Sequence, residues 1–174
     1  NVTTPLQFCF ASGRARSRWH QVQLLMRPRI EHAVVDLSPP AYTGRPSYRF
    51  TAGEKPLQGL VGSRIELEVT SNRSLASGTL RIAPADGSAE MEERTVDAGI
   101  LGKTATFVWT LDATADLDVR VTGAGGLVGA EPMRVRQKAI PDRPPEVWPS
   151  DIDPFSLATP GAKLEVGVAS TDDV

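Results

Sequence analysis

The sequence is poor in the residues that most hydrolases and metalloproteins depend on. It has one cysteine, Cys9, and two histidines, His20 and His32, in 174 residues. A single cysteine can form neither an intramolecular disulfide nor an all-cysteine zinc site. No His-Glu-x-x-His pattern and no Gly-x-Ser-x-Gly turn occurs, so zinc-protease and serine-hydrolase motifs are absent. We therefore expect no catalytic residues, no metal site and no cofactor.

These three residues have structural interpretations. Cys9 lies between Phe8 and Phe10 in an apolar run, which predicts a packed or edge-strand thiol. His20 follows a tryptophan at the start of a predicted strand, and His32 follows an Arg-Pro step, so we expect both at a surface or an interface.

Strong charge of one sign and long apolar runs are also missing. The formal net charge is −2 and aromatic residues make up 6% of the chain, so no global basic field and no aromatic ladder favours nucleic acid. Five arginines do gather early, and we interpret them as a charged turn and an exposed strand face: Arg14, Arg16, Arg18, Arg27 and Arg29. No apolar run approaches the roughly 18 residues that a membrane span needs.

Short segments in which apolar and polar residues alternate dominate the chain. Residues 64–70 are the clearest example, because successive side chains of a strand point to opposite faces of the sheet. Turn-forming residues separate the segments, and no segment has apolar residues at helical spacing. This pattern predicts an all-β fold, an immunoglobulin-like antiparallel β-sandwich of seven or eight strands. Its predicted core consists of Ile65, Leu67, Val69, Leu80, Ile82, Phe107, Trp109, Leu111, Leu117, Val119 and Val121.

Three groups of residues invite a chemical interpretation. The glycines at 123, 125, 126 and 129 resemble a dinucleotide loop, but they lead into another strand and so predict a hairpin connection. The glutamates at 90, 92 and 93 could in principle serve glycosidase chemistry, yet no aromatic residue accompanies them. Calcium at a domain joint is a further alternative, and its candidate ligands are Asp142, Asp151, Asp153, Asp172 and Asp173 near the C-terminal end, with Asp112, Asp116 and Asp118.

Two internal similarities suggest a tandem repeat. Residues 62–70 align with residues 161–169, and residues 6–13 align with residues 117–124. Both offsets are on the order of 100 residues, about the length of one immunoglobulin-type domain. We therefore divide the chain into closing strands of a preceding unit (1–28), a complete sandwich (29–139), and a linker with opening strands of a following unit (140–174). The proline-rich linker predicts a semi-rigid joint.

Several motifs carry a resemblance to a known family. These are Pro39-Pro40-Ala41-Tyr42-Thr43-Gly44, Asn72-Arg73-Ser74-Leu75, the linker Pro141-Asp142-Arg143-Pro144-Pro145, and Ala169-Ser170-Thr171-Asp172-Asp173, which departs from the family pattern by one inserted residue. Over most of residues 20–174 the chain resembles the Ig-like repeat domains of large bacterial membrane-anchored envelope proteins of unknown function. The resemblance implies a location in the bacterial cell envelope, on the periplasmic or extracytoplasmic side, with an anchor outside this segment.

The expected function is therefore a non-catalytic spacer or scaffold in a tandem Ig-like protein. Its expected partner is a protein, or a second copy of the chain, bound through exposed strands of the flanking segments. We expect neither nucleic-acid binding nor direct membrane contact in this segment. The alternative is a β-sandwich module that binds carbohydrate or peptidoglycan, which a row of exposed aromatic side chains would favour.

Overall fold

A computed structural model describes residues 6–22, 25–85, 92–143, 146–150, 159–161, 163 and 167–171. The described chain is all β, apart from one short 3-10 turn, η1 (Ala41–Thr43). Its strands are β1 (Leu6–Phe8), β2 (Ala11–Ser12), β3 (Ala15–Arg16), β4 (His20–Val22), β5 (Ile30–Ser38), β6 (Tyr48–Thr51), β7 (Leu57–Leu60), β8 (Arg64–Ser71), β9 (Leu75–Pro84), β10 (Arg94–Asp97), β11 (Gly99–Leu101), β12 (Thr104–Thr110), β13 (Ala115–Gly123), β14 (Met133–Ile140), β15 (Glu146–Ser150) and β16 (Gly167–Thr171).

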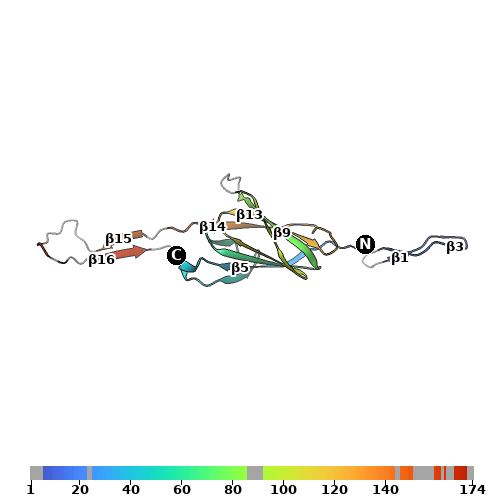
Figure 1. The fold of residues 1–174 in the computed structure, drawn as a ribbon, viewed down its shortest axis with the longest axis horizontal. Coiled ribbons are helices and arrows are strands. Elements are labelled where there is room, and N and C mark those ends of the chain that lie inside the picture. The colour runs from blue at the N-terminus through green and yellow to red at the C-terminus, as the bar shows by residue number, and fades with distance from the viewer. Residues whose placement is uncertain are drawn as a thin grey trace.

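Two five-stranded sheets form a central sandwich (Figure 1). One sheet has the order β10-β9-β13-β14-β7, and the other has the order β11-β12-β8-β5-β6. Neighbouring strands are antiparallel, except that β14 pairs with β7 in parallel over residues 137–140 and 57–60. Ala98 separates β10 from β11, and the chain passes there from one sheet to the other.

The expected strand number was wrong. The sandwich has ten strands in place of seven or eight, and one of its pairs is parallel. The extra strands are the short segments β6, β7, β10 and β11, of three or four residues each. Segments this short show too few alternations to be recognised from sequence, and pairing with a neighbouring strand is what orders them.

The predicted core is confirmed. All eleven residues expected inside the sandwich are buried and belong to one hydrophobic cluster, to which both sheets contribute. β8 explains why: Ile65, Leu67 and Val69 are buried, while Arg64 on its other face is exposed. The predicted glycine-rich connection is confirmed as well, because residues 124–132 join the antiparallel strands β13 and β14.

A small hairpin and a small strand pair flank the sandwich at its opposite ends (Figure 1). Residues 6–22 form what we call the N-terminal hairpin, in which β1 pairs with β4 and β2 with β3, both antiparallel. β15 and β16 form what we call the C-terminal strand pair, which is also antiparallel. Neither the hairpin nor the C-terminal strand pair has a second layer of described residues over it, so their side chains are mostly exposed.

Candidate interaction surfaces

The outer face of β9, β13 and β14 carries rows of alternating charge. In the register of these strands Asp118 lies between Arg81 and Arg134, and Asp116 lies opposite Arg136. Asp118 accepts a hydrogen bond of 2.9 Å from the Nε of Arg120, and its other oxygen lies 3.6 Å from the Nε of Arg134. Opposite charges at facing positions support the pairing of antiparallel strands.

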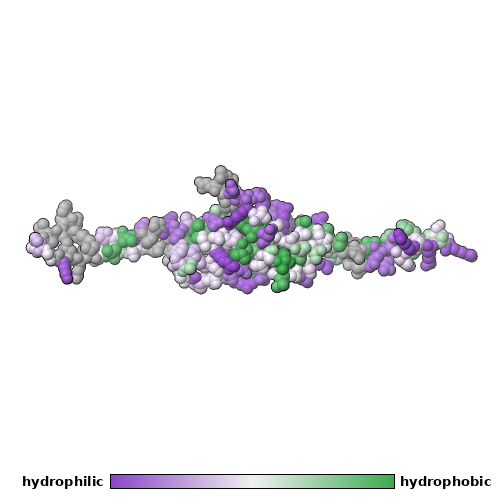
Figure 2. Space-filling view, in the orientation of Figure 1, coloured by the Kyte–Doolittle hydropathy of each residue, from purple (hydrophilic) through white to green (hydrophobic). Residues whose placement is uncertain are grey.

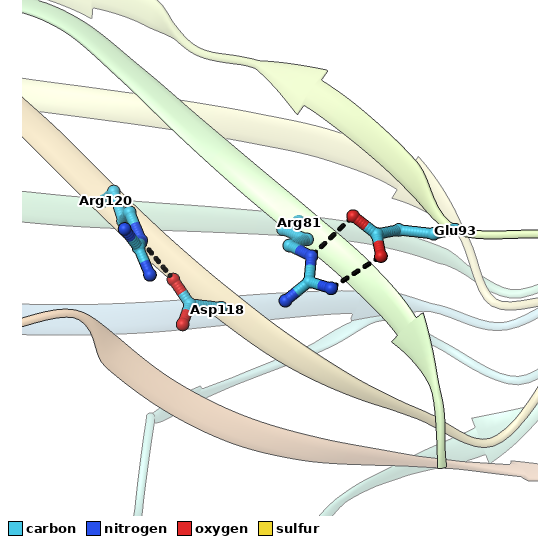
Figure 3. A network of polar contacts seen from close by, with 4 residues as sticks. All are labelled: Arg81, Glu93, Asp118 and Arg120. Atoms are coloured by element: carbon cyan, nitrogen blue, oxygen red, sulfur yellow. Dashed lines mark hydrogen bonds and ion pairs between the residues drawn. The ribbon is translucent and has the colours of Figure 1, made fainter. Parts of the chain in front are cut away.

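Ion pairing shifts the pKa values of this face. Arg81 donates two hydrogen bonds to Glu93 from its Nε and Nη2 (Figure 3). This contact lowers the pKa of Glu93 and raises that of Arg81. The hydrogen bond from Arg120 lowers the pKa of Asp118, partial burial opposes that effect, and the charges of Arg120 and Arg134 add to it. These carboxylates therefore stay ionised at neutral pH.

The same face is hollowed into an open groove of about 530 Å³, lined in part by Arg81, Asp116, Asp118, Arg134 and Arg136. Each of its arginines already has a carboxylate partner: Glu93 for Arg81, Asp118 for Arg134 and Asp116 for Arg136. An anionic ligand would have to displace these partners. The groove is therefore lined by charged side chains that are already paired with one another.

The first junction joins the N-terminal hairpin to the sandwich. Pro28 is almost fully buried, and its ring lies beside Gly123, the last residue of β13. A Cβ added at Gly129 would lie 3.3 Å from the carbonyl oxygen of Pro28, so the loop and the chain pass close together. Asn72 adds two hydrogen bonds to the backbone of Arg29. The side-chain Oδ1 of Asn72 accepts from the Arg29 backbone N–H at 2.9 Å, and the backbone N–H of Asn72 donates to the Arg29 carbonyl at 3.1 Å.

The second junction leads from the sandwich toward the C-terminal strand pair. The hydroxyl of Tyr42 in η1 donates a 2.7 Å hydrogen bond to Oδ2 of Asp142 in the linker. In η1 the amides of Thr43 and Gly44 donate to the carbonyls of Pro40 and Ala41, and Gly44 has a φ of 62°, which glycine adopts without strain. The Pro-Pro-Ala-Tyr-Thr-Gly motif therefore forms a tight turn that presents Tyr42 to the linker.

The N-terminal hairpin is amphipathic. Leu6 pairs with Val22 and Phe8 with His20, so these four side chains share one face, whereas Gln7 and Gln21 share the other. The ring of Phe8 stacks on His20 and meets Phe10 edge to face, with centroids 5.3 and 5.5 Å away. The side chain of Phe10 is 68% exposed. One face of the hairpin is thus apolar and faces solvent.

The C-terminal strand pair also has an uncovered apolar face. Val147 pairs with Ser170 and Pro149 with Val168, so these four residues share one face. Val147 and Val168 are each 63% exposed. Figure 2 shows apolar side chains on the surface at both ends of the molecule, beyond the sandwich. The described part of this strand pair thus exposes two valines on one face.

The residues singled out from the sequence do not converge on one site. Cys9 is half-buried directly after β1, His20 belongs to the aromatic group described above, and His32 is exposed on β5. Asp112 pairs with Arg94, with 2.7 Å between oxygen and nitrogen, while Asp116 and Asp118 pair with Arg136 and Arg134 of the groove. Glu90, Asp151, Asp153, Asp172 and Asp173 lie outside the described residues. Within the described part, no three metal-ligating side chains gather.

Sequence reasoning missed the buried polar side chains of the described residues, Ser63, Ser71 and Gln137, of which Gln137 is the largest. The side chain of Gln137 on β14 is fully buried; its Oε1 accepts a 2.9 Å hydrogen bond from Nε1 of Trp109, and its Nε2 donates to the Ala113 carbonyl at 2.8 Å. It thereby links the two sheets. The available signal was its position, because it continues the inward-facing series of Met133 and Val135.

No family model, no curated protein and no solved structure matches this chain. Among the described residues, no helix has the length and the apolar character needed to cross a membrane.

Proposed function

We propose that the chain is a non-catalytic spacer or scaffold module of a tandem immunoglobulin-like array. The strand order of the sandwich supports this class. β11-β12-β8-β5 follows the order D-E-B-A of an immunoglobulin sheet, and β9-β13-β14 follows C-F-G, with β10 in the place of C′. β6 and β7 are additions between the first two long strands, and with one cysteine the sandwich has no disulfide between its sheets.

The observation that carries the proposal is the register of the C-terminal strand pair. Ala33 lies opposite Val69 in the sandwich, and Pro149 lies opposite Val168 in the strand pair. Aligning residues 62–70 with residues 161–169 places Val168 on Val69. Because Val69 faces Ala33 and Val168 faces Pro149, Pro149 then corresponds to Ala33. The same shift in residue number aligns Arg27-Pro28 with Arg143-Pro144.

Two further correspondences support a repeat. Gly62 and Gly161, which align, both precede a strand in a turn with positive φ, 87° and 90°. At the other end, Leu6 lies opposite Val22 as Leu117 lies opposite Val135. The N-terminal hairpin thus matches β13–β14, and the C-terminal strand pair matches β5–β8.

The two junctions support a spacer with defined joints. Asn72, Tyr42 and Asp142 all come from the motifs that resemble the envelope-protein repeats, and each makes a hydrogen bond at a junction. A bacterial envelope location, with an anchor in another part of the protein, belongs to the same proposal. In the N-terminal hairpin the rings of Phe8 and Phe10 are nearly perpendicular, at 87°, so these two rings do not form the flat platform on which a sugar would stack.

A distance measurement between two spin labels tests the semi-rigid joint. In a Cys9→Ser background, cysteines replace Val108 on the sandwich and Trp148 on the C-terminal strand pair, both of which are exposed. We expect a narrow distance distribution that broadens when Tyr42→Phe removes the hydrogen bond to Asp142.

Tyr48→Phe is the matched control, because it removes a hydroxyl that bonds the Gln58 carbonyl away from the joint. It should leave the distribution narrow. A broad distribution in the parent protein would contradict the spacer, and retention of the chain on purified peptidoglycan would favour the binding module.

A further inference from the structure

We propose that two copies of this chain associate head to tail, with the C-terminal strand pair of one copy packing on the apolar face of the other copy's N-terminal hairpin. This inference rests on the proposed repeat. In the sandwich, the strands that match the two flanking pieces lie in opposite sheets, β5–β8 in one and β13–β14 in the other. Their inward side chains meet in a single core.

The two flanking pieces are therefore complementary halves of one sandwich. The N-terminal hairpin presents Leu6, Phe8 and Phe10 where β13 presents the buried Leu117, Val119 and Val121. The C-terminal strand pair presents Val168 where β8 presents the buried Val69. Packed together, the two exposed faces would cover each other as the two layers do in the sandwich.

Charge complementarity favours the same partner. Residues 1–29 contain five arginines and no acidic residue, whereas residues 140–174 contain seven acidic residues against one arginine and one lysine. Opposite charges of this size attract the two ends of different molecules, and like charges discourage pairing of two identical ends.

The positions of the charges fit the proposed packing. In the sandwich, the loop between β13 and β14 lies against Pro28, just before β5. The equivalent turn of the N-terminal hairpin carries the exposed Arg14 and leads to the exposed Arg16 and Arg18. In the rebuilt unit this turn lies at the start of β15, where Glu146 is exposed.

The ends of one molecule cannot satisfy each other. The N-terminal hairpin and the C-terminal strand pair lie on opposite sides of the sandwich (Figure 1). The central sandwich is also a poor alternative partner, because its edge strands β6, β7, β10 and β11 are short. A contact between two different surfaces leads to chains or rings unless it is blocked.

Complementary variants test the proposal. Phe10→Asp places a charge on the hairpin face, and Val168→Asp places one on the face of the strand pair; both side chains are more than half exposed, so the sandwich should remain folded. Sedimentation velocity should show wild-type mass increasing with concentration. For each variant alone, the dissociation constant of self-association should rise roughly tenfold or more, so that the variant stays monomeric at concentrations where the wild type associates. An equimolar mixture should form a one-to-one heterodimer, because it retains one intact hairpin and one intact strand pair.

Gln21→Asp and Ala169→Asp are the matched controls, since both residues lie on the opposite faces of the same elements. They should associate as the wild type does. A wild type that is monomeric at every concentration, a variant that self-associates as strongly as the wild type, or a mixture that stays monomeric would each overturn the proposal. Those results would leave the spin-label test of the spacer unaffected.

Discussion

At the scale of single residues, the buried amide of Gln137 links the two sheets across the core by a hydrogen bond. Trp109 comes from β12 in one sheet and Gln137 from β14 in the other. An indole N–H inside a core needs an acceptor, and an unpaired one costs about 1–3 kcal/mol. Gln137 provides that acceptor while its own amide group is satisfied by the Ala113 carbonyl.

We expect Gln137→Leu to lower the free energy of unfolding by about 1–3 kcal/mol, because it leaves the Trp109 N–H and the Ala113 carbonyl without partners. Urea unfolding followed by tryptophan fluorescence measures the change. Trp109→Phe should lower the free energy of unfolding less in the Gln137→Leu variant than in the wild type, because in that variant it also removes the unpaired indole N–H. Gln58→Leu, at an exposed position of β7, is the control and should change stability little.

At the scale of elements, the sheets are held by apolar alternation on the inside and by ion pairs on the outside. The side chain of Asp118 is 15% exposed, whereas its partners Arg120 and Arg134 are 58% and 78% exposed. Such a pair is partly screened by water, and exposed pairs contribute up to about 1 kcal/mol. The charged rows therefore assist the register that the core residues impose.

We expect Asp118→Asn to cost about 0.5–1 kcal/mol at neutral pH. Because folding lowers the pKa of Asp118, its contribution is present above the pKa of the unfolded chain, roughly 4, and is lost as the pH falls through the folded value. The difference in unfolding free energy between wild type and variant should therefore shrink below about pH 4. Asp97→Asn on β10 is the control, and a difference that grew toward acid pH would contradict the assignment.

At the scale of the whole molecule, the junctions decide how the flanking strand pairs are oriented. The N-terminal side is fixed by buried Pro28 and by the Asn72 hydrogen bonds, and the C-terminal side by the bond from Tyr42 to Asp142. The hydrogen bonds among these contacts are few and exposed. The joints should therefore open with a smaller free energy than the sandwich.

We expect Asn72→Ala to speed hydrogen exchange of the Arg29 amide by roughly fivefold to tenfold, because that amide loses its acceptor. Amides of β8 and β12 should keep their protection, since the sandwich core is untouched. Two-dimensional NMR exchange measurements resolve both sets. Equal acceleration throughout the sandwich would mean that Asn72 supports the core and not the junction.

Much of the central sandwich could be predicted from particular residues. Ile65, Leu67 and Val69 identified β8, and the glycines after β13 identified a hairpin, because period-two alternation and turn residues are local signals. The short strands β6, β7, β10 and β11 and the parallel pairing of β7 with β14 could not be predicted, because only a neighbouring strand supplies their hydrogen bonds.

The sequence by itself determined the strand character, the inward face of each long strand and the opposite charges of the two ends, because each of these is written in composition or in a short periodic pattern. Only the tertiary structure decided which distant residues meet: Gln137 with Trp109, Tyr42 with Asp142, and Asn72 with Arg29. Such contacts depend on where strands far apart in the chain are placed, and no local pattern encodes that placement.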